Sequence, residues 1–278
     1  MNQVDLHLHS AASDGVWRPA DVVRLAHERG LTTIALTDHD TTAGLREAIS
    51  TGQAVGIEVI GGLEINSETD LGHLDFLAYG CDVENIAFQD QLQDIRDARV
   101  GRARGMVKKL AELGVPVAWE RVLFFAGDAQ SIARPHVARA LVEAGHVASI
   151  QAAFDNYLRD GGPAYAHRLE LKPQEVIDLI HQAGGVCVLA HPGHARTTHL
   201  IPLLAELGLD GVEVYYFDHS DEQQAELRAL ADQHGLIVTG GSDFHGDATH
   251  AELGSVPVPA EVVERLKERL AQRWARRA

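Results

Sequence analysis

Residues 4–15 read VDLHLHSAASDG, a short apolar run that contains two histidines and leads into a turn. In an extended strand the side chains of His7 and His9 point to one side, and those of Leu6 and Leu8 point to the other. Two imidazoles on one side can share a metal ion, and the flexible AASDG turn lets Asp14 fold back over them. The stretch predicts the first strand of a sheet. The histidine pair fits either a surface strand or the first part of a metal site.

Six further short apolar runs predict β-strands, and helical patterns lie between most of them. The helices expected at Pro19–Arg29 and Pro173–Ala183 have proline near the start and glycine after the end. Strands that alternate with helices through short connections predict an α/β protein with a mostly parallel sheet, open or closed into a barrel. The seven expected strands are Val4–His7, Thr33–Thr37, Ile57–Glu64, Leu74–Tyr79, Val186–Ala190, Gly211–Val214 and Leu236–Gly240.

The interval from residue 85 to residue 171 breaks this alternation, because it shows helical patterns and no strand pattern. Helices are expected at Asp90–Leu113, Arg134–Ala144 and Ser149–Leu158. A structureless loop of this length inside a compact domain is rare, so we expect a helical insertion. The predicted organisation is a metal-binding barrel formed by residues 1–84 and 172–278, with residues 85–171 inserted as a helical cap and substrate domain.

The composition narrows the class of protein. The 278 residues carry a formal net charge of −16, which argues against binding of long nucleic acid. A small phosphate substrate is still compatible, because bound metal ions would reverse the local charge. No apolar run is long enough to span a membrane, and no signal peptide is evident. The two cysteines stand in apolar contexts, which indicates reduced thiols and a cytoplasmic protein.

Histidines and acidic residues stand at or just after the ends of five predicted strands. In a parallel barrel the carboxyl ends of the strands open onto one face, so residues far apart in sequence meet there. Imidazoles together with carboxylates suit zinc, manganese or iron better than calcium or magnesium. Nine candidate ligands exceed the needs of one ion and predict a cluster of two or three ions. They are His7, His9, Asp14, His39, Glu64, His73, His191, Asp243 and His245.

His73 differs from the other candidates because it begins a predicted strand. The short segment between Glu64 and His73 cannot hold a helical crossover, which needs about a dozen residues or more. The two strands should therefore pair antiparallel. The start of the second strand would then lie beside the end of the first, and His73 would join the same rim.

Six motifs resemble, in order, those of the polymerase-and-histidinol-phosphatase (PHP) family of metal phosphoesterases: DLHLHS…SDG, LTDHD, GLEIN, HLDFLAYG, AHP and GSDFH. The resemblance covers nearly the whole chain, with no motif position evidently replaced. It implies a distorted seven-stranded (β/α) barrel and two or three divalent ions, manganese foremost and zinc or iron as alternatives. By similarity, His7, His9, Glu64 and Asp243 hold one ion, Glu64 bridges to a second ion with His73 and His191, and Asp14, His39 and His245 hold a third.

The insertion resembles the helical cap of those family members that act on nucleotide phosphates, through the stretches SIARPHVARAL and FDNYLRDGGPAYAH. This likeness implies hydrolysis of the 3′-phosphate of 3′,5′-nucleoside bisphosphates such as pAp by a metal-activated water, and degradation of short RNA from the 5′ end. The alternatives are a histidinol-phosphate phosphatase, an exonuclease on longer nucleic acid and a non-catalytic metal-bound module. The net charge counts against longer nucleic acid, and the full ligand set counts against the module.

Two further residues are candidates for contact with the substrate. Arg134 suits a phosphate because its planar guanidinium can donate two parallel hydrogen bonds, although an arginine at a helix start can instead pair with a nearby acid. His194 lies three residues after His191 and is the candidate catalytic residue, as a phosphate contact or as the acid that protonates the leaving group. Asp38 and Asp40 flank His39 and are expected to orient it.

Overall fold

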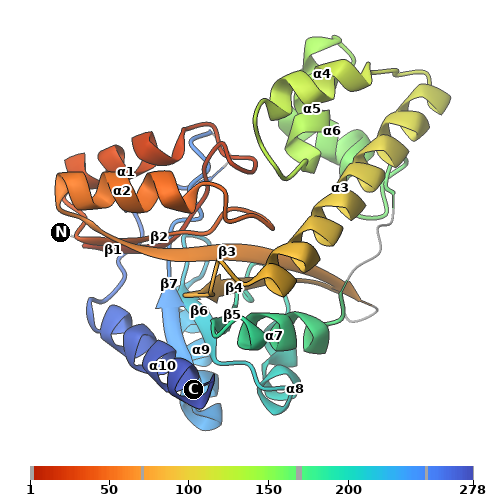
Figure 1. Ribbon diagram of the computed structural model, residues 1–278. Coiled ribbons are helices and arrows are strands. Elements are labelled where there is room, and N and C mark those ends of the chain that lie inside the picture. Colours follow the sequence, from red (N-terminus) through yellow and green to blue (C-terminus); the bar gives the residue numbers. More distant parts are fainter. Residues whose placement is uncertain (1–2, 70–71, 167–170, 248–249, 278) are drawn as a thin grey trace.

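Seven strands form one sheet, and their order in the sheet is their order along the chain (Figure 1). The computed structural model describes residues 3–69, 72–166, 171–247 and 250–277; His167, the last residue of the second cap motif, lies outside them. The predicted α/β class with seven strands is confirmed. The strands are β1 (Val4–Leu8), β2 (Thr33–Leu36), β3 (Glu58–Thr69), β4 (Gly72–Tyr79), β5 (Val186–Leu189), β6 (Gly211–Tyr215) and β7 (Ile237–Gly240).

The strand β4 is antiparallel to both of its neighbours, whereas the other adjacent strands are parallel. The antiparallel pairing of β3 with β4 is as predicted from the short connection. Both strands are longer than predicted, however, so that Glu64 lies opposite Leu77 and His73 lies opposite Glu68. Beyond β7 the chain returns to β1, where Leu8 and Phe244 form a parallel bridge. The sheet therefore curls, and its first and last strands meet next to the strand ends.

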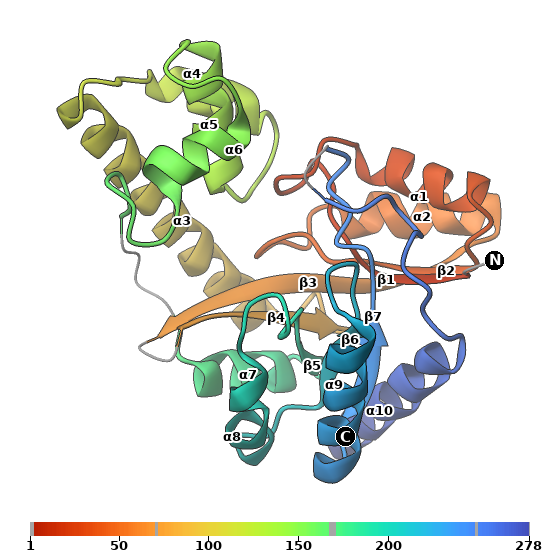
Figure 2. The ribbon, with the colours of Figure 1, turned by 180° about the vertical axis from the view of Figure 1, so that it is seen from behind.

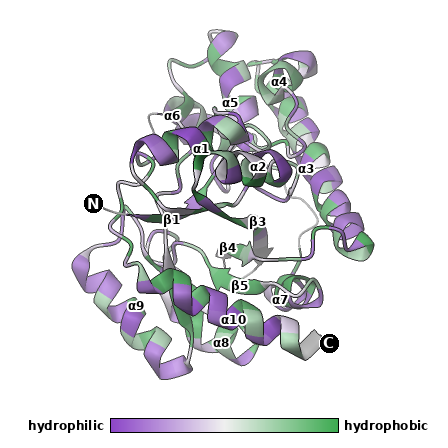
Figure 3. Ribbon diagram, turned by 60° about the vertical axis from the view of Figure 1, so that its left-hand side comes forward, coloured by the Kyte–Doolittle hydropathy of each residue, from purple (hydrophilic) through white to green (hydrophobic). Residues whose placement is uncertain are grey.

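Helices follow most strands and pack their apolar faces against the sheet, as the hydropathy colouring in Figure 3 shows. In α1, proline is at the first helical position, and Val22, Val23 and Ala26 are buried on one face. In α9, Ser220 caps the start and Gly235 adopts the left-handed conformation after the end. These outer helices are α1 (Pro19–Glu28), α2 (Leu45–Val55), α7 (Pro173–Gln182), α8 (Ile201–Glu206), α9 (Asp221–His234) and α10 (Glu261–Arg277).

The remaining helices lie between β4 and β5 and form a helical segment at one side of the sheet, which Figure 2 shows from behind. The long α3 begins at Ile86, four residues before the helix start that we predicted, and the side chain of the preceding Asn85 accepts a hydrogen bond from the Phe88 backbone. The short α4 is absent from the predicted elements. The segment comprises α3 (Ile86–Glu112), α4 (Trp119–Ala126), α5 (Arg134–Glu143), α6 (Ile150–Ala153) and the π-helix η1 (Phe154–Leu158).

The helical segment has a hydrophobic core of its own, which includes Met106, Leu110, Val122 and Leu141. The first turns of α3 instead pack Phe88 into the core of the sheet. One continuous helix thus joins two hydrophobic cores. No helix within the described ranges has the length and hydropathy that a membrane span requires.

Candidate metal centre

The first group of candidate ligands lies on β1, β3 and the segment after β7. Ligand atoms of His7, His9, Glu64 and Asp243 lie within 4.8 Å of one another, and all four side chains are buried. The Nε2 atoms of His7 and His9 are 3.1 Å apart, and His9 Nε2 is 3.2 Å from both Glu64 Oε2 and Asp243 Oδ1. These four residues are the set that the family resemblance implies for one ion.

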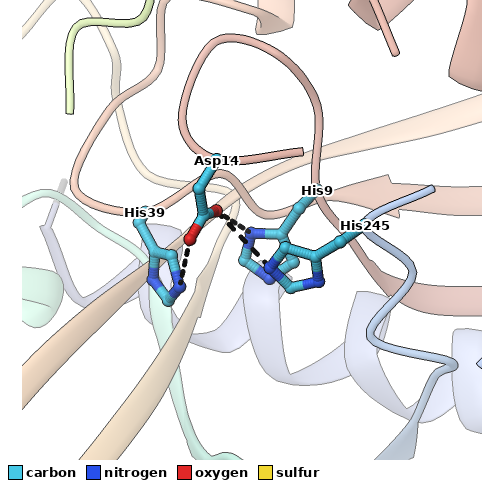
Figure 4. A group of neighbouring side chains, drawn as sticks. All are labelled: His9, Asp14, His39 and His245. Carbon is cyan, nitrogen blue, oxygen red and sulfur yellow. Dashed lines mark ion pairs between the residues drawn. The ribbon is translucent and has the colours of Figure 1, made fainter. Parts of the chain in front are cut away.

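The second group surrounds Asp14 (Figure 4). The Asp14 carboxylate lies between His39 on one side and His9 and His245 on the other, with one oxygen 3.4 Å from His245 Nε2 and the other 3.8 Å from His39 Nε2. His9 belongs to both groups, because its Nδ1 is 3.9 Å from Asp14 whereas its Nε2 faces Glu64. Asp14 thus folds back over the histidines, as the AASDG turn suggested.

The third group contains Glu64, His191 and a residue that the sequence analysis did not select, Asp75. His191 Nε2 is 3.3 Å from Glu64 Oε1 and 3.8 Å from Asp75 Oδ2. Among the described residues, none of the close ligand groups includes His73, whose Nε2 instead lies 3.3 Å from Asp75 Oδ1. The extended hairpin explains this difference, since His73 pairs with Glu68, four residues along β3 from Glu64, whereas Asp75 pairs with Asn66, two residues from Glu64. Strand alternation marked Asp75 as well as His73, because residues 73 and 75 share one face, but it could not choose between them.

Replacing Asp75 by asparagine should therefore lower the metal affinity about 10- to 100-fold, because a carboxylate close to Glu64 and His191 is lost. Replacing His73 by asparagine is the matched control, and we expect it to keep the metal content. Metal bound after dialysis, measured by mass spectrometry of the elements, distinguishes the two variants. If only the His73 variant loses metal, His73 and not Asp75 is the ligand, as the family resemblance implied.

Buried carboxylates hold the candidate ligands in place from behind. Glu213 accepts a hydrogen bond from His7 Nδ1 at 3.1 Å, so the Nε2 lone pair of His7 faces the ligand group. Asp38 accepts from the Ser10 backbone, the Ser10 hydroxyl and the Ser13 hydroxyl, each at 2.7 Å. These bonds fix the turn that carries Asp14, so Asp38 orients that turn.

Arginines from α3 fix the loop that carries His39. Arg96 donates to the Asp40 carbonyl at 2.9 Å, and the buried Arg99 guanidinium contacts the Asp40 carboxylate. Arg99 also contacts the side chain of Asn66, which in turn contacts Asp75. The helical segment therefore positions candidate ligands of the sheet.

Backbone strain is concentrated at the strand ends. Asp40, His191 and Asp243 have φ values of 53°, 29° and 53°, in the left-handed region that residues other than glycine seldom adopt. Each such residue costs about 1–3 kcal/mol and persists only where the surroundings enforce it. The strain is consistent with a chain held to direct particular side chains into the site.

Imidazoles and carboxylates lie close together in the cluster and shift one another's pKa values. Burial alone would raise the pKa of Glu64, but the imidazoles of His39 and His7 hold it well below its usual range. Burial likewise opposes protonation of His9 and His191, yet carboxylate neighbours that include Glu64 raise the pKa of each to about 9. Without ions, protons on the imidazoles balance the carboxylates, and a bound metal ion must displace these protons.

The pKa values predict how metal binding depends on pH. For His9 and His191 the folded-state pKa, about 9, lies above the unfolded value of about 6.5. Their contribution to stability without metal is complete below about pH 6.5 and is lost as the pH rises through about 9. We therefore expect the thermal stabilisation by Mn²⁺, relative to protein in EDTA, to be larger at pH 8.5 than at pH 6.5. Equal stabilisation at both pH values would contradict this expectation.

The donor set fits divalent transition-metal ions. The Nδ1 atoms of His9, His39 and His191 are buried and make no hydrogen bond within the described part of the chain. A buried polar atom without a partner is costly, so these nitrogens indicate that a further binding partner belongs in the cluster. Imidazoles combined with carboxylates are typical ligands of zinc, manganese and iron.

Arg134 and His194 line the same cavity of about 610 Å³ as six of the nine candidate ligands. Arg134 Nη1 lies 2.6 Å from Asp160 Oδ1, so the alternative of a pairing with a nearby acid is realised. His194 is half-exposed, and its Nδ1 lies 2.7 Å from Asp218 Oδ2. A histidine that the sequence analysis did not select, His250, stacks on His245 with ring centroids 3.9 Å apart.

The arrangement of buried histidines and carboxylates at the strand ends agrees with the results of comparison with known proteins. Residues 5–195 match the family model described as the PHP domain. The chain belongs to the PHP domain family. It is 34% identical over 250 residues to the 3′,5′-nucleoside bisphosphate phosphatase of Chromobacterium violaceum, with 88% of each chain covered. It is also 34% identical to the 5′-3′ exoribonuclease Rnm of Salmonella typhimurium, with 90% of this chain and 87% of the relative covered.

A solved structure resembles this protein over nearly the whole chain. The protein from Bifidobacterium adolescentis, described as a metal-dependent phosphoesterase, superimposes with a TM-score of 0.89 at 32% identity, and 96% of each chain is covered. The family, the enzyme class and the kind of reaction expected from the sequence are those of these relatives. The family model and the full-length relatives thus confirm the resemblance that the six motifs carried.

Proposed function

We propose that this PHP-domain protein is a divalent-metal-dependent phosphatase that removes the 3′-phosphate of 3′,5′-nucleoside bisphosphates such as pAp. In the same proposal the protein also degrades short RNA from the 5′ end. The observation that carries the proposal is one cavity lined both by six of the nine predicted metal ligands and by arginines of the helical segment. The named activities of the two curated relatives support the substrate class.

The cofactor in this proposal is a cluster of two or three divalent ions, with manganese first and zinc or iron as alternatives. The ligands would be the predicted residues other than His73, with Asp75 in its place beside Glu64 and His191. When bound, such ions neutralise phosphoryl oxygens and lower the pKa of a water that attacks phosphorus. The carboxylate of Glu213 keeps His7 in the tautomer whose Nε2 is free to bind.

Side chains that do not bind the ions would bind the substrate phosphate and protonate the leaving group. Arg134 would hold a substrate phosphate, because its guanidinium lines the cavity and already binds a carboxylate there. His194 would give the leaving oxygen a proton from Nε2, while Asp218 accepts from Nδ1 and holds the ring.

The proposed domain organisation follows from the same cavity. Residues 1–84 and 172–278 would form the metal-binding barrel, and residues 85–171 would form the inserted cap that encloses the nucleotide. The separate hydrophobic core of the helical segment supports this division. The free thiols of Cys81 and Cys187 suit a reducing compartment, so we propose a cytoplasmic location.

Release of inorganic phosphate from pAp and from histidinol phosphate, each with Mn²⁺, tests the proposal. We expect phosphate from pAp, stepwise shortening of a 5′-phosphorylated trinucleotide, and little phosphate from histidinol phosphate. Release from histidinol phosphate alone would favour the alternative phosphatase. No product from any of the three substrates, in protein shown to contain metal, would indicate a non-catalytic metal-bound module.

A further inference from the structure

Two arginines of the helical segment converge on one carboxylate, that of Asp160. Arg134 Nη1, at the start of α5, lies 2.6 Å from Asp160 Oδ1, and Arg102 Nη2, on α3, lies 3.9 Å from the same oxygen. We propose that this arginine pair is the subsite for the second, non-reacting phosphate of the substrate, and that Asp160 occupies the position of that phosphate before the substrate binds. The inference rests on the proposed function and specifies how its substrate is recognised.

Each guanidinium of the pair is held by its surroundings. The Cζ atom of Arg102 lies 5.2 Å from the ring centroid of Tyr165, and that of Arg134 lies 5.7 Å from the ring centroid of Phe154. Arg102 also donates from Nε to the Ala166 carbonyl at 3.1 Å. An aromatic face behind a guanidinium restricts its orientation, so the pair is preorganised to receive an anion.

The burial of the three side chains differs in a way that suits exchange of anions. The side chain of Arg102 is only 8% exposed, and that of Arg134 is 23% exposed, whereas that of Asp160 is 55% exposed. The carboxylate can therefore turn toward solvent while both arginines stay in place. A phosphate monoester carries more negative charge than a carboxylate and accepts more hydrogen bonds, so it should displace Asp160.

The subsite is separate from the candidate metal centre but faces the same cavity. Arg102 and Arg134 form ion pairs with Asp160, whereas the candidate ligands form ion pairs with one another. Both arginines and Asp160 line the cavity together with His191 and other candidate ligands. A cavity of about 610 Å³ is within the range that binds small molecules of nucleotide size. One phosphate at the metal centre and a second at the arginine pair would be the two ends of one bisphosphate.

Kinetics on matched substrates test the subsite, with pAp carrying both phosphates and adenosine 3′-monophosphate carrying only the reacting one. For Arg134→Gln we expect the KM of pAp to rise about 10- to 100-fold, the loss expected for a charge-assisted hydrogen bond. The KM of adenosine 3′-monophosphate should change less than about twofold, and Asp160→Asn should lower the KM of pAp. Arg104→Gln is the control, because Arg104 is on α3 but stacks over Trp119 outside the cavity.

A binding measurement separates failure of the subsite from failure of the proposed function. Adenosine 5′-monophosphate, which carries only the non-reacting phosphate, is titrated by calorimetry into protein in EDTA. We expect Arg134→Gln and Arg102→Gln to weaken this binding at least about tenfold, and Arg104→Gln to leave it unchanged. If Arg102→Gln does not fold, as judged by circular dichroism, the more exposed Arg134 still decides the question. Equal binding by wild type and Arg134→Gln, or equal KM increases for both nucleotides, would overturn the proposal.

Discussion

Glu64→Gln should lose most of its bound metal and at least about 10³-fold of its phosphatase kcat/KM. Glu64 Oε2 lies 3.2 Å from His9 Nε2, while Oε1 lies 3.3 Å from His191 Nε2, so one side chain joins two ligand groups. A glutamine keeps the size of the side chain but offers one oxygen and no negative charge. Elemental metal content and phosphate release from pAp measure the two effects.

The matched control for Glu64→Gln is Glu58→Gln, which lies on the same strand. Glu58 is half-exposed and pairs with Lys267 at 2.9 Å, far from the ligand groups. We expect the control to keep its metal and its activity, because an exposed ion pair contributes at most about 1 kcal/mol. A Glu64→Gln protein with a full metal complement and with kcat/KM within tenfold of wild type would contradict the assignment of Glu64 as the shared ligand.

Asp210→Ala should destabilise the protein by about 3–5 kcal/mol without changing the metal ligands. The buried Asp210 carboxylate accepts from the Cys187 backbone at 3.0 Å and pairs with His181, Arg269 and Arg273. Removal of the carboxylate takes the charged partner from two arginines of α10, which keep only backbone carbonyl acceptors, and the acceptor from the Cys187 N–H. We expect the midpoint of thermal unfolding to fall by about 10 °C, with metal content per folded chain unchanged.

The stability that the Asp210 carboxylate contributes should depend on pH, which gives a second check on its role. Burial opposes the charged form of Asp210, but hydrogen bonds from His181 and Arg273 lower its pKa. A lowered folded-state pKa adds stability above the unfolded value of about 3.9, and that stability is lost as the pH falls through the folded-state value. Asp232→Asn, on the exposed side of α9, is the control and should unfold like wild type. An Asp210→Ala protein as stable as this control would refute the anchoring role.

Local patterns were sufficient to predict the strands and the residues at their ends. Apolar runs between helical patterns identified seven strands, and the parallel arrangement implied that their carboxyl ends meet. His9, Asp14, Glu64 and Asp243 come together as expected. His9 and Asp243 lie just after β1 and β7, a position that short-range sequence patterns specify, and Glu64 ends the apolar run of its predicted strand, although the observed β3 continues beyond it.

The register in which β3 pairs with β4 could not be predicted from these patterns. The hairpin of β3 and β4 extends past both predicted strand ends, and this extension places Asp75 opposite Asn66 and His73 opposite Glu68. Both residues have the same parity along the strand, so alternation could not choose between them. Only the pairing of one strand with the other determined that Asp75 is the neighbour of Glu64 and His191.

The amino-acid sequence by itself determined the α/β class, the family and most of the candidate metal ligands, because strand alternation and strand ends are local properties. Tertiary structure alone determined the grouping of Arg102, Arg134 and Asp160, which come from separate parts of the helical segment. Helix packing brings such charges together, and nothing in the spacing of residues 102, 134 and 160 specifies it. The candidate ligands thus follow largely from local sequence patterns, whereas the packing of the helical segment determines which of its side chains line the cavity beside them.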